Sequence, residues 1–432
     1  MDKFVIEGGY PLRGTVQVSR AKNAALPIMA AALLAEGQTV IRNCPHLADI
    51  EAMGVLLRAL GATVKRTNGD LIINVAGAKL NSLAPYDIVR KMRASFCALG
   101  PLIGRVRQAK VSLPGGCVIG PRPVDLHLKG LRALGCTLDI EGGYVIADGS
   151  NLKGATVYLG GPFGSTVLGT ANVMMAATLA PGTTLIEDAA CEPEVINLIE
   201  CLKKMGARIR YAGPKCLEIK GVKRLHGTTI DLIPDRIEAG TYMMAAAATR
   251  GDVTVEGLCV EHLYAVIDRL RAAGVAVTPK GRDAIRVVSD GRFTPVDVVT
   301  LPYPGFPTDL QAQALTLLTA AEGLSVVTEN IYPDRFMHVA ELGRMGADIR
   351  KEGPHAIISG HPKMSGAPVM ASDLRASAAL VIAGLMAQGE TTVNRVYHID
   401  RGYEHIEKKL RGLGAQIRRA SDGLPPPAPG AE

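Results

Sequence analysis

The sequence is poor in aromatic residues, with no tryptophan, 6 phenylalanines and 11 tyrosines among 432 positions. It also lacks a long apolar run, because the longest one, Leu26–Ala35, has about half the length that a bilayer-spanning helix needs. No stretch interleaves clustered lysines and arginines with aromatics, so the net charge of +7 indicates no nucleic-acid partner. These absences predict a soluble globular protein with small aliphatic side chains in its cores, and the length predicts roughly two or three domains.

The spacing of the cysteines shows no metal-binding or redox motif. None of the eight forms a CxxC pair, which argues against zinc and thioredoxin-type chemistry. The start, Met1-Asp2-Lys3, has no signal-peptide character. We therefore expect a cytoplasmic protein with reduced thiols, no metal and no membrane association.

A short pattern recurs six times: Leu, two or three residues, Gly, a small residue and then an aliphatic one, starting at positions 57, 131, 202, 270, 342 and 410. The intervals are 74, 71, 68, 72 and 68 residues. The leucine belongs to the apolar end of a helix, the glycine takes the left-handed conformation that ends it, and the following residues open a strand. A period held through five intervals predicts six copies of one unit.

Each copy also has an earlier half, in which an alanine-rich helix ends at a glycine and passes into a β-rich strand. The predicted helices are 24–36, 170–180, 240–249 and 376–387, and the strands after them are 38–42, 183–187, 252–256 and 391–395. The unit therefore reads strand–helix–strand–helix–strand. One such unit cannot close a core by itself, so several must pack together.

The stretch 113–123, LPGGCVIGPRP, has three glycines and three prolines and is predicted to be a loop. It carries Cys117 and, five residues later, Arg122. A thiol on such a loop can move against a substrate, and a guanidinium beside it can hold an anion and tune the thiol. Taken alone, these residues fit equally well a surface turn with an incidental cysteine.

Polar residues interrupt the apolar pattern mainly where the alanine-rich helices are predicted to begin. Capping explains the Asp and Asn residues among them, but cations at helix starts are locally unfavourable unless an anion is bound there. The pattern favours an anionic ligand. The residues are Lys22, Asn23, Arg93, Asn172, Glu238, Asp309 and 373–375.

In these motifs the chain resembles the UDP-N-acetylglucosamine 1-carboxyvinyltransferase family of enolpyruvyl transferases, from Met1 to about residue 420. Nine segments carry the resemblance in chain order: 21–25 (AKNAA), 93–95 (RAS), 114–117 (PGGC), 122–125 (RPVD), 234–238 (PDRIE), 306–309 (FPTD), 335–338 (RFMH), 373–377 (DLRAS) and 400–404 (DRGYE).

The resemblance implies an α/β fold of two similar domains, each an inside-out α/β barrel of three repeats. Residues 1–21 with 235–420 would form the catalytic domain, residues 22–234 the second domain with the Cys117 loop, and residues 421–432 a disordered tail. The implied reaction transfers the enolpyruvyl group of phosphoenolpyruvate to the 3-hydroxyl of UDP-N-acetylglucosamine by addition and elimination, with release of phosphate. This is the first step of peptidoglycan synthesis, and neither cofactor nor metal is implied.

The resemblance also implies roles for single residues. Cys117 would be the general acid and form a covalent adduct with phosphoenolpyruvate, and Asp309 would be the base toward the sugar hydroxyl or simply the N-cap of the following helix. Arginines suit both polyanionic substrates because their donors bind phosphate and carboxylate in pairs. The residues expected to bind phosphoenolpyruvate are Lys22, Asn23, Arg122, Arg335, Arg375 and Arg401. Those expected to bind UDP-N-acetylglucosamine are Asn23, Arg93, Arg122, Pro123, Val124, Asp125, Leu126, Thr166, Asp309 and Ile331.

Three positions depart from the family pattern. Arg20 stands where Gly is usual, Cys191 stands where Arg is common, and 160–169 has about two extra residues, with Thr166 in the place of a serine. Two alternatives remain: an enolpyruvyl transferase acting on shikimate 3-phosphate, or a catalytically silent relative that binds a UDP-sugar. The oligomeric state is not predicted.

Overall fold

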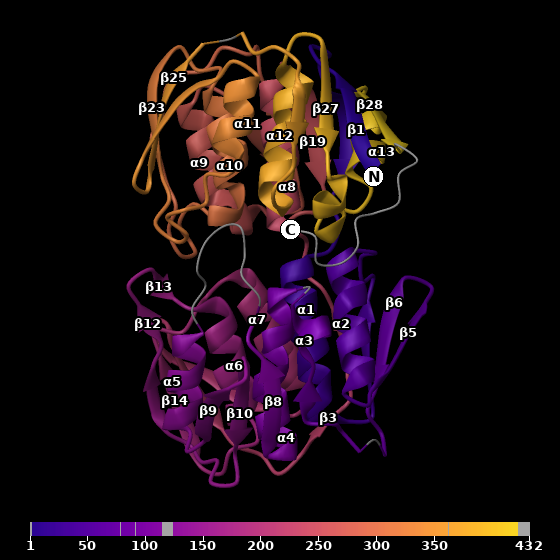
Figure 1. Ribbon diagram of the computed structural model, residues 1–432, viewed down its shortest axis with the longest axis vertical. Coiled ribbons are helices and arrows are strands. Elements are labelled where there is room, and N and C mark those ends of the chain that lie inside the picture. Colours follow the sequence, from indigo (N-terminus) through magenta and orange to yellow (C-terminus); the bar gives the residue numbers. More distant parts are fainter. Residues whose placement is uncertain (1, 78, 91, 115–123, 362, 422–432) are drawn as a thin grey trace. The chain divides into compact units, whose positions relative to one another are not determined.

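The computed structural model describes residues 2–77, 79–90, 92–114, 124–361 and 363–421, whose helices and strands are labelled in Figure 1. The chain divides into two compact units. Unit 1 combines residues 2–19 with the chain from Pro234 onward, and unit 2 runs from Arg20 to Ile233. Each unit has its own hydrophobic core. No helix of the described residues has the length and hydropathy that a bilayer crossing requires.

Unit 2 contains three four-stranded sheets, each with one parallel pair and two antiparallel pairs. In sheet order the first is β18 (Thr229–Asp231), β4 (Gln38–Arg42), β6 (Asp70–Asn74) and β5 (Thr63–Thr67). The second is β7 (Leu83–Ala84), β8 (Gln108–Ser112), β10 (Tyr144–Asp148) and β9 (Thr137–Glu141). The third is β11 (Thr156–Tyr158), β14 (Thr183–Glu187), β16 (Cys216–Lys220) and β15 (Arg208–Gly213). Two short pairs join β3 (Ala35–Glu36) to β17 (Leu225–His226) and β12 (Gly160–Gly161) to β13 (Gly164–Ser165).

Unit 1 repeats this sheet pattern three times. Its sheets are β2 (Arg13–Gln17), β19 (Asp252–Glu256), β21 (Ala284–Val288) and β20 (Ala276–Lys280); β22 (Val298–Val299), β23 (Gly323–Thr328), β25 (His355–Gly360) and β24 (Asp348–Glu352); and β26 (Pro368–Met370), β27 (Glu390–Asn394), β1 (Asp2–Glu7) and β28 (Gln416–Ser421). The N-terminal strand β1 thus completes the sheet of the last repeat, which closes the unit.

In each unit a set of nearly fully buried helices lies inside and the sheets lie outside. Figure 1 shows this in unit 1, where α8, α10 and α12 stand between β23 and β25 on one side and β1, β27 and β28 on the other. The helices of unit 2 are α1 (Lys22–Ala31), η1 (Ala32–Leu34), α2 (Ala48–Ala59), α3 (Tyr86–Val89), η2 (Arg93–Ala98), α4 (Leu99–Val106), α5 (Asp125–Ala133), α6 (Val167–Ala177) and α7 (Pro193–Lys204). Those of unit 1 are α8 (Arg236–Ala248), η3 (Val260–Leu263), α9 (Tyr264–Ala272), η4 (Thr308–Leu310), α10 (Gln311–Leu318), α11 (His338–Arg344), α12 (Leu374–Met386), η5 (Val396–Arg401) and α13 (Ile406–Gly412).

The inner helices are buried on all sides, which explains their composition. In α8, 12 of 13 residues are buried, and in α10 every residue is. A helix without a solvent face needs no polar stripe, and small residues let neighbouring helices approach closely. This arrangement accounts for the alanine-rich runs in the sequence.

The predicted repetition is confirmed. All six recurring glycines have positive φ, between 89° and 102°, and each separates a helix from a strand. They are Gly61, Gly135, Gly206, Gly274, Gly346 and Gly414. The strands predicted at 38–42, 183–187 and 252–256 are found at those residues, and the fourth is shifted by one, to Glu390–Asn394.

Two details differ from the prediction. Each sheet has four strands where the predicted unit has three, because the strand after the second helix turns back into one more antiparallel strand, as β15 does into β16. The inner helices α1, α6, α8 and α12 also begin two to four residues earlier than the alanine runs do. Asn172, predicted at a helix start, is therefore the sixth residue of α6 and fully buried.

Candidate active site

The predicted site residues fall on both units, and each group is described within its own unit. Unit 1 holds Asp309, Ile331, Arg335, Arg375 and Arg401, and unit 2 holds Lys22, Asn23, Arg93, Val124, Asp125, Leu126 and Thr166. Three further predicted residues, Cys117, Arg122 and Pro123, lie outside the described residues.

In unit 1, Asp309 is held between two arginines from different repeats. Arg335 Nη1 donates to Asp309 Oδ1 over 2.9 Å, and Arg375 Nη2 donates to Asp309 Oδ2 over 3.0 Å. The side chains of Arg335 and Arg375 are 6% and 2% exposed, whereas that of Asp309 is 26% exposed. The carboxylate is therefore the accessible member of a buried ionic cluster.

The two arginines also decide the protonation state of Asp309. Burial raises the pKa of its carboxyl, but ion pairing with Arg375 and Arg335 outweighs burial and holds the pKa well below its usual range. Asp309 is thus ionised at all ordinary pH values.

Both arginines have further N–H donors, here called the reserve donors, beside those that bind Asp309. Nε and Nη1 of Arg375 and Nε of Arg335 are buried without a hydrogen-bond partner in the described part of the chain. Buried donors of this kind carry a desolvation cost that an anionic ligand would relieve. The cluster therefore has positive charge and hydrogen-bonding capacity beyond what Asp309 takes up.

Glu329, which the sequence reading missed, organises the neighbouring loop. It is fully buried, and its Oε1 accepts hydrogen bonds from Thr300 Oγ1 and from the backbone N–H groups of Ile331 and Tyr332, at 2.8 to 2.9 Å. Its Oε2 accepts from Thr308 Oγ1 at 2.8 Å, and Thr308 Oγ1 in turn accepts from Arg335 over 3.0 Å. Ile331 and the Arg335–Asp309 pair are therefore fixed by one carboxylate.

Tyr403 supports Arg375 from the other side. Its ring lies under the guanidinium, with 5.4 Å between the guanidinium carbon and the ring centroid, and its hydroxyl is hydrogen bonded to Thr241 Oγ1 at 2.8 Å. Gln313 Nε2 donates to that hydroxyl over 3.3 Å and to the backbone oxygen of Asp309 over 3.1 Å. Arg401, the last residue of η5, is two residues before Tyr403 and half-buried.

In unit 2, Lys22 opens α1 in a buried ion pair. Its Nζ donates to Asp49 Oδ2 over 2.8 Å, and the two side chains are 8% and 6% exposed. Asn23 follows and is half-buried. The cation predicted at this helix start is thus balanced by Asp49 of α2, a residue that no local motif singles out.

The candidate nucleotide-binding residues come from three segments of unit 2. Arg93 opens η2, Val124 precedes α5, Asp125 and Leu126 open α5, and Thr166 is the N-cap of α6, where its Oγ1 accepts from Gly169 N over 3.2 Å. The departing stretch 160–169 contains the β12–β13 hairpin, the N-cap Thr166 and the first residues of α6. A Cβ placed on Gly161 would lie 3.0 Å from Leu126 Cδ1, so the hairpin packs directly against α5.

The capping role considered for Asp309 is wrong. Asp309 lies inside η4, whose N-cap is Pro307, and the N-cap of α10 is Leu310. The aspartates that do cap inner helices are Asp235, which accepts from Ile237 N and Glu238 N, and Asp373, which accepts from Arg375 N and Ala376 N. The contacts of the Asp309 carboxylate described here are those with Arg335 and Arg375 in the ionic cluster.

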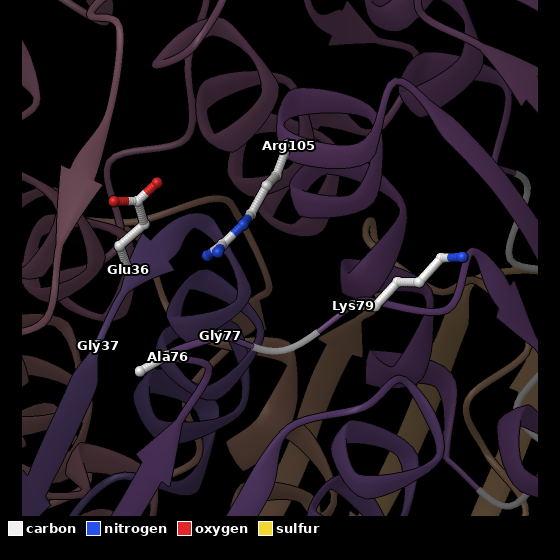
Figure 2. Close-up of a pocket in the computed structure, with 6 residues that line it drawn as sticks. All are labelled: Glu36, Gly37, Ala76, Gly77, Lys79 and Arg105. Atoms are coloured by element: carbon white, nitrogen blue, oxygen red, sulfur yellow. The ribbon is translucent and has the colours of Figure 1, made fainter.

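A hollow elsewhere in unit 2 contains none of the predicted residues. It has a volume of about 580 Å³ and is lined by Glu36, Gly37, Ala76, Gly77, Lys79 and Arg105, with Glu36 and Lys79 at opposite sides in Figure 2. Arg105 donates to the backbone oxygens of Leu33 and Ala35, which ties α4 to the end of η1. Among the residues described, no group of His, Cys, Asp or Glu has an arrangement suited to a metal ion.

Comparison with known proteins gives a consistent result along the whole chain. The family model described as EPSP synthase (3-phosphoshikimate 1-carboxyvinyltransferase) matches residues 6–410. A UDP-N-acetylglucosamine 1-carboxyvinyltransferase of Methylacidiphilum infernorum is 53% identical over 97% of this chain and 99% of its own. One of an Anaeromyxobacter species is 54% identical over the same shares.

Solved structures agree on the fold. The enolpyruvyl transferase NikO from Streptomyces tendae has a TM-score of 0.88 at 26% identity, covering 97% of this chain and 99% of its own. An EPSP synthase from Acinetobacter baumannii has a TM-score of 0.76 at 20% identity, covering 98% and 100%, which speaks for the fold alone. The predicted α/β fold of repeated units is confirmed by these neighbours.

Proposed function

The chain belongs to the EPSP synthase family of carboxyvinyl (enolpyruvyl) transferases, and we propose that it transfers the enolpyruvyl group of phosphoenolpyruvate to the 3-hydroxyl of UDP-N-acetylglucosamine. The observation that carries the choice of acceptor is the full-length identity of more than half with relatives named for that acceptor. The proposed reaction is the first step of peptidoglycan synthesis, and with it we propose a cytoplasmic location and roles in cell-wall formation, cell shape and division.

The proposed chemistry joins the acceptor oxygen to C2 of phosphoenolpyruvate while a proton is added to its methylene carbon. A tetrahedral ketal results. Loss of a proton from the new methyl group and of phosphate from C2 then gives the enol ether and inorganic phosphate. No cofactor or metal takes part.

Cys117 is the proposed acid, and the thiol that an epoxide such as fosfomycin would alkylate. A thiol with a reference pKa of about 8.5 is mostly protonated at neutral pH and can deliver its proton to the methylene carbon. Its sulfur can also add to phosphoenolpyruvate to form the covalent adduct. Arg122 is proposed to hold the phosphate near it.

Asp309 is the proposed base toward the sugar hydroxyl. Its position between Arg335 and Arg375 supports a coupling of the two substrates, because a phosphoenolpyruvate anion that engages the reserve donors weakens the hold of the arginines on Asp309. The carboxylate then becomes more basic when the donor substrate is present. Lys22, Asn23 and Arg401 complete the proposed phosphoenolpyruvate site, and Arg93, Pro123, Val124, Asp125, Leu126, Thr166 and Ile331 the proposed acceptor site.

The test is release of phosphate from phosphoenolpyruvate with UDP-N-acetylglucosamine or shikimate 3-phosphate as the acceptor. We expect release only with UDP-N-acetylglucosamine, and loss of it in Cys117→Ala. Release with shikimate 3-phosphate alone would show that this compound, and not UDP-N-acetylglucosamine, is the acceptor. A protein that binds UDP-N-acetylglucosamine but releases no phosphate would be a silent relative, and Arg20→Gly would then be the first reversion to make.

A further inference from the structure

Asn172 lies where three segments of unit 2 meet. It is fully buried in α6, and its Oδ1 accepts from the backbone N–H of Gly100 in α4 over 2.8 Å. Its Nδ2 donates to the backbone oxygen of Phe96 in η2 over 3.0 Å and faces His127 Nδ1 in α5 over 2.9 Å. One amide group therefore joins η2, α4, α5 and α6.

The hydrogen-bond pattern fixes the orientation of this amide and the tautomer of His127. A flipped amide would place Nδ2 against the Gly100 N–H and Oδ1 against the Phe96 oxygen, so both bonds would become repulsive. Nδ2 must donate to His127, whose Nδ1 is then an acceptor and whose proton is on Nε2. Burial, with a further contribution from the charge of Arg93, lowers the pKa of His127 to about 3, so the ring stays neutral.

The backbones around the amide are too close to permit an alternative packing. A Cβ on Gly100 would lie 2.2 Å from the backbone oxygen of Asn172, and a Cβ on Gly130 would lie 2.3 Å from Val173 Cγ2. The rings of His127 and Phe96 also pack edge to face, with 5.2 Å between the ring centroids. Asn172 and His127 therefore form a pair, here called the Asn172 clamp, at a tightly packed junction of helices.

The residues that the clamp joins are close in sequence to residues of the proposed acceptor site. Phe96 is three residues after Arg93, His127 is the next residue after Leu126, and Asn172 is six residues after Thr166. We propose that Asn172 and His127 are positioning residues that hold Arg93, Leu126 and Thr166 in the spacing that binds the nucleotide of UDP-N-acetylglucosamine. This inference rests on the proposed function.

The kinetic consequence is specific. Among the described residues, the hydrogen bonds of the clamp join segments of unit 2, whereas the ionic cluster around Asp309 is built from unit 1. Loosening it should weaken acceptor binding, with a loss of about tenfold or more in affinity, since small misplacements of binding groups have large effects. The KM for phosphoenolpyruvate should change less than about twofold.

The variants separate the clamp from general packing. His127→Gln removes the Nδ1 acceptor, whereas His127→Asn keeps an acceptor near the place of Nδ1 and should restore the bond to Asn172. Asn172→Ala removes the clamp altogether, at the risk of a folding defect. Thr178→Val is the matched control, because it removes a buried side-chain hydrogen bond, to Met175 O at 2.7 Å, at the other end of α6.

The experiment measures calorimetric binding of UDP-N-acetylglucosamine, both KM values and the melting temperature for each protein. We expect His127→Gln to lose acceptor affinity, His127→Asn to recover most of it, and Thr178→Val to bind like the wild type. If His127→Gln melts earlier but binds the acceptor normally, the clamp is only structural and the inference is overturned. If the wild type itself fails to bind UDP-N-acetylglucosamine, the proposed function falls, and the inference with it.

Discussion

Replacing Asp309 by Asn tests the ionic cluster most directly. The variant keeps the shape of the side chain but removes the negative charge that both Arg335 and Arg375 contact, at 2.9 and 3.0 Å. It leaves two guanidinium groups that are 6% and 2% exposed facing a neutral amide. A buried charge without its partner is destabilising, so the variant should unfold more easily.

The size of the effect follows from the burial of the partners. Removing one member of a fully buried pair costs about 3–5 kcal/mol, and the partial exposure of Asp309 places the expected loss nearer to about 3 kcal/mol. For a unit of this size that corresponds to a fall in melting temperature of roughly 6–12 °C. Loss of the proposed base should also lower turnover by about 10²- to 10⁴-fold.

The sign of the pH dependence is fixed by the lowered pKa of Asp309. A carboxyl whose pKa is lower in the folded protein stabilises it above the unfolded value, near about 3.9, and loses that contribution as the pH falls through the folded value. The stability difference between the wild type and Asp309→Asn should therefore be constant above about pH 5 and shrink in stronger acid.

Scanning calorimetry with and without phosphoenolpyruvate checks these expectations. Asp252→Asn is the control, because Asp252 makes an equally short two-point contact with Arg286, at 2.8 and 2.6 Å, but on the surface. It should melt close to the wild type. Phosphoenolpyruvate should raise the melting temperature of Asp309→Asn more than that of the wild type. In the variant no carboxylate at position 309 neutralises Arg335 and Arg375, so both can interact more strongly with the bound anion. Equal melting of Asp309→Asn and the wild type would refute the account of a buried, coupled cluster.

Three further predictions concern other parts of the molecule. Cys117→Asp should retain turnover, because a carboxylic acid can also donate a proton, and should resist fosfomycin; a folded, substrate-binding but inactive variant would contradict the acid role. Asp49→Asn should destabilise unit 2 by about 3 kcal/mol, because it leaves the Lys22 ammonium buried, and urea unfolding measures this loss. Gly100→Ala should lower the melting temperature and the acceptor affinity together, because its Cβ would collide with the backbone of Asn172; unchanged melting would contradict the close helix contact.

Much of the fold could be predicted because its signals are local. A glycine that ends a helix and the β-branched run after it act within about six residues, and Gly61, Gly206 and Gly346 have the conformation that this reasoning requires. The helix starts were less accurate because the prediction followed alanine, whereas the first turns of α1 and α8 contain Lys22 and Arg236. The second strand of each hairpin, such as β16 after β15, could not be predicted from the recurring motif, because the motif ends at the strand before it.

The same distinction separates the site residues. Asp309, Arg335 and Arg375 could be predicted because each lies in a short motif. Asp49 and Glu329 could not, because each is identified only by what it meets in space, a lysine 27 residues away and a set of donors up to 29 residues away. Contacts between residues so far apart in sequence are decided by tertiary packing, and neither periodicity nor a turn motif predicts them.

Three buried polar residues of the inner helices occupy nearly the same position in successive repeats. Asn172, Thr241 and Gln313 lie 30, 29 and 29 residues before the recurring leucines at 202, 270 and 342, so they occupy nearly the same place in three successive units. Each is fully buried or 1% exposed and hydrogen bonds to another inner segment: Asn172 to Gly100, and Gln313 to Thr241 over 3.2 Å. Helices lined with alanine can slide against one another with little change in contact, whereas a hydrogen bond from a buried polar side chain favours one register. The repeat thus supplies a fixed point near the N-terminal ends of its inner helices. Thr166 and Asp309, both proposed to bind substrate, lie six and four residues before Asn172 and Gln313. Arg93 lies three residues before Phe96, to whose backbone oxygen Asn172 donates.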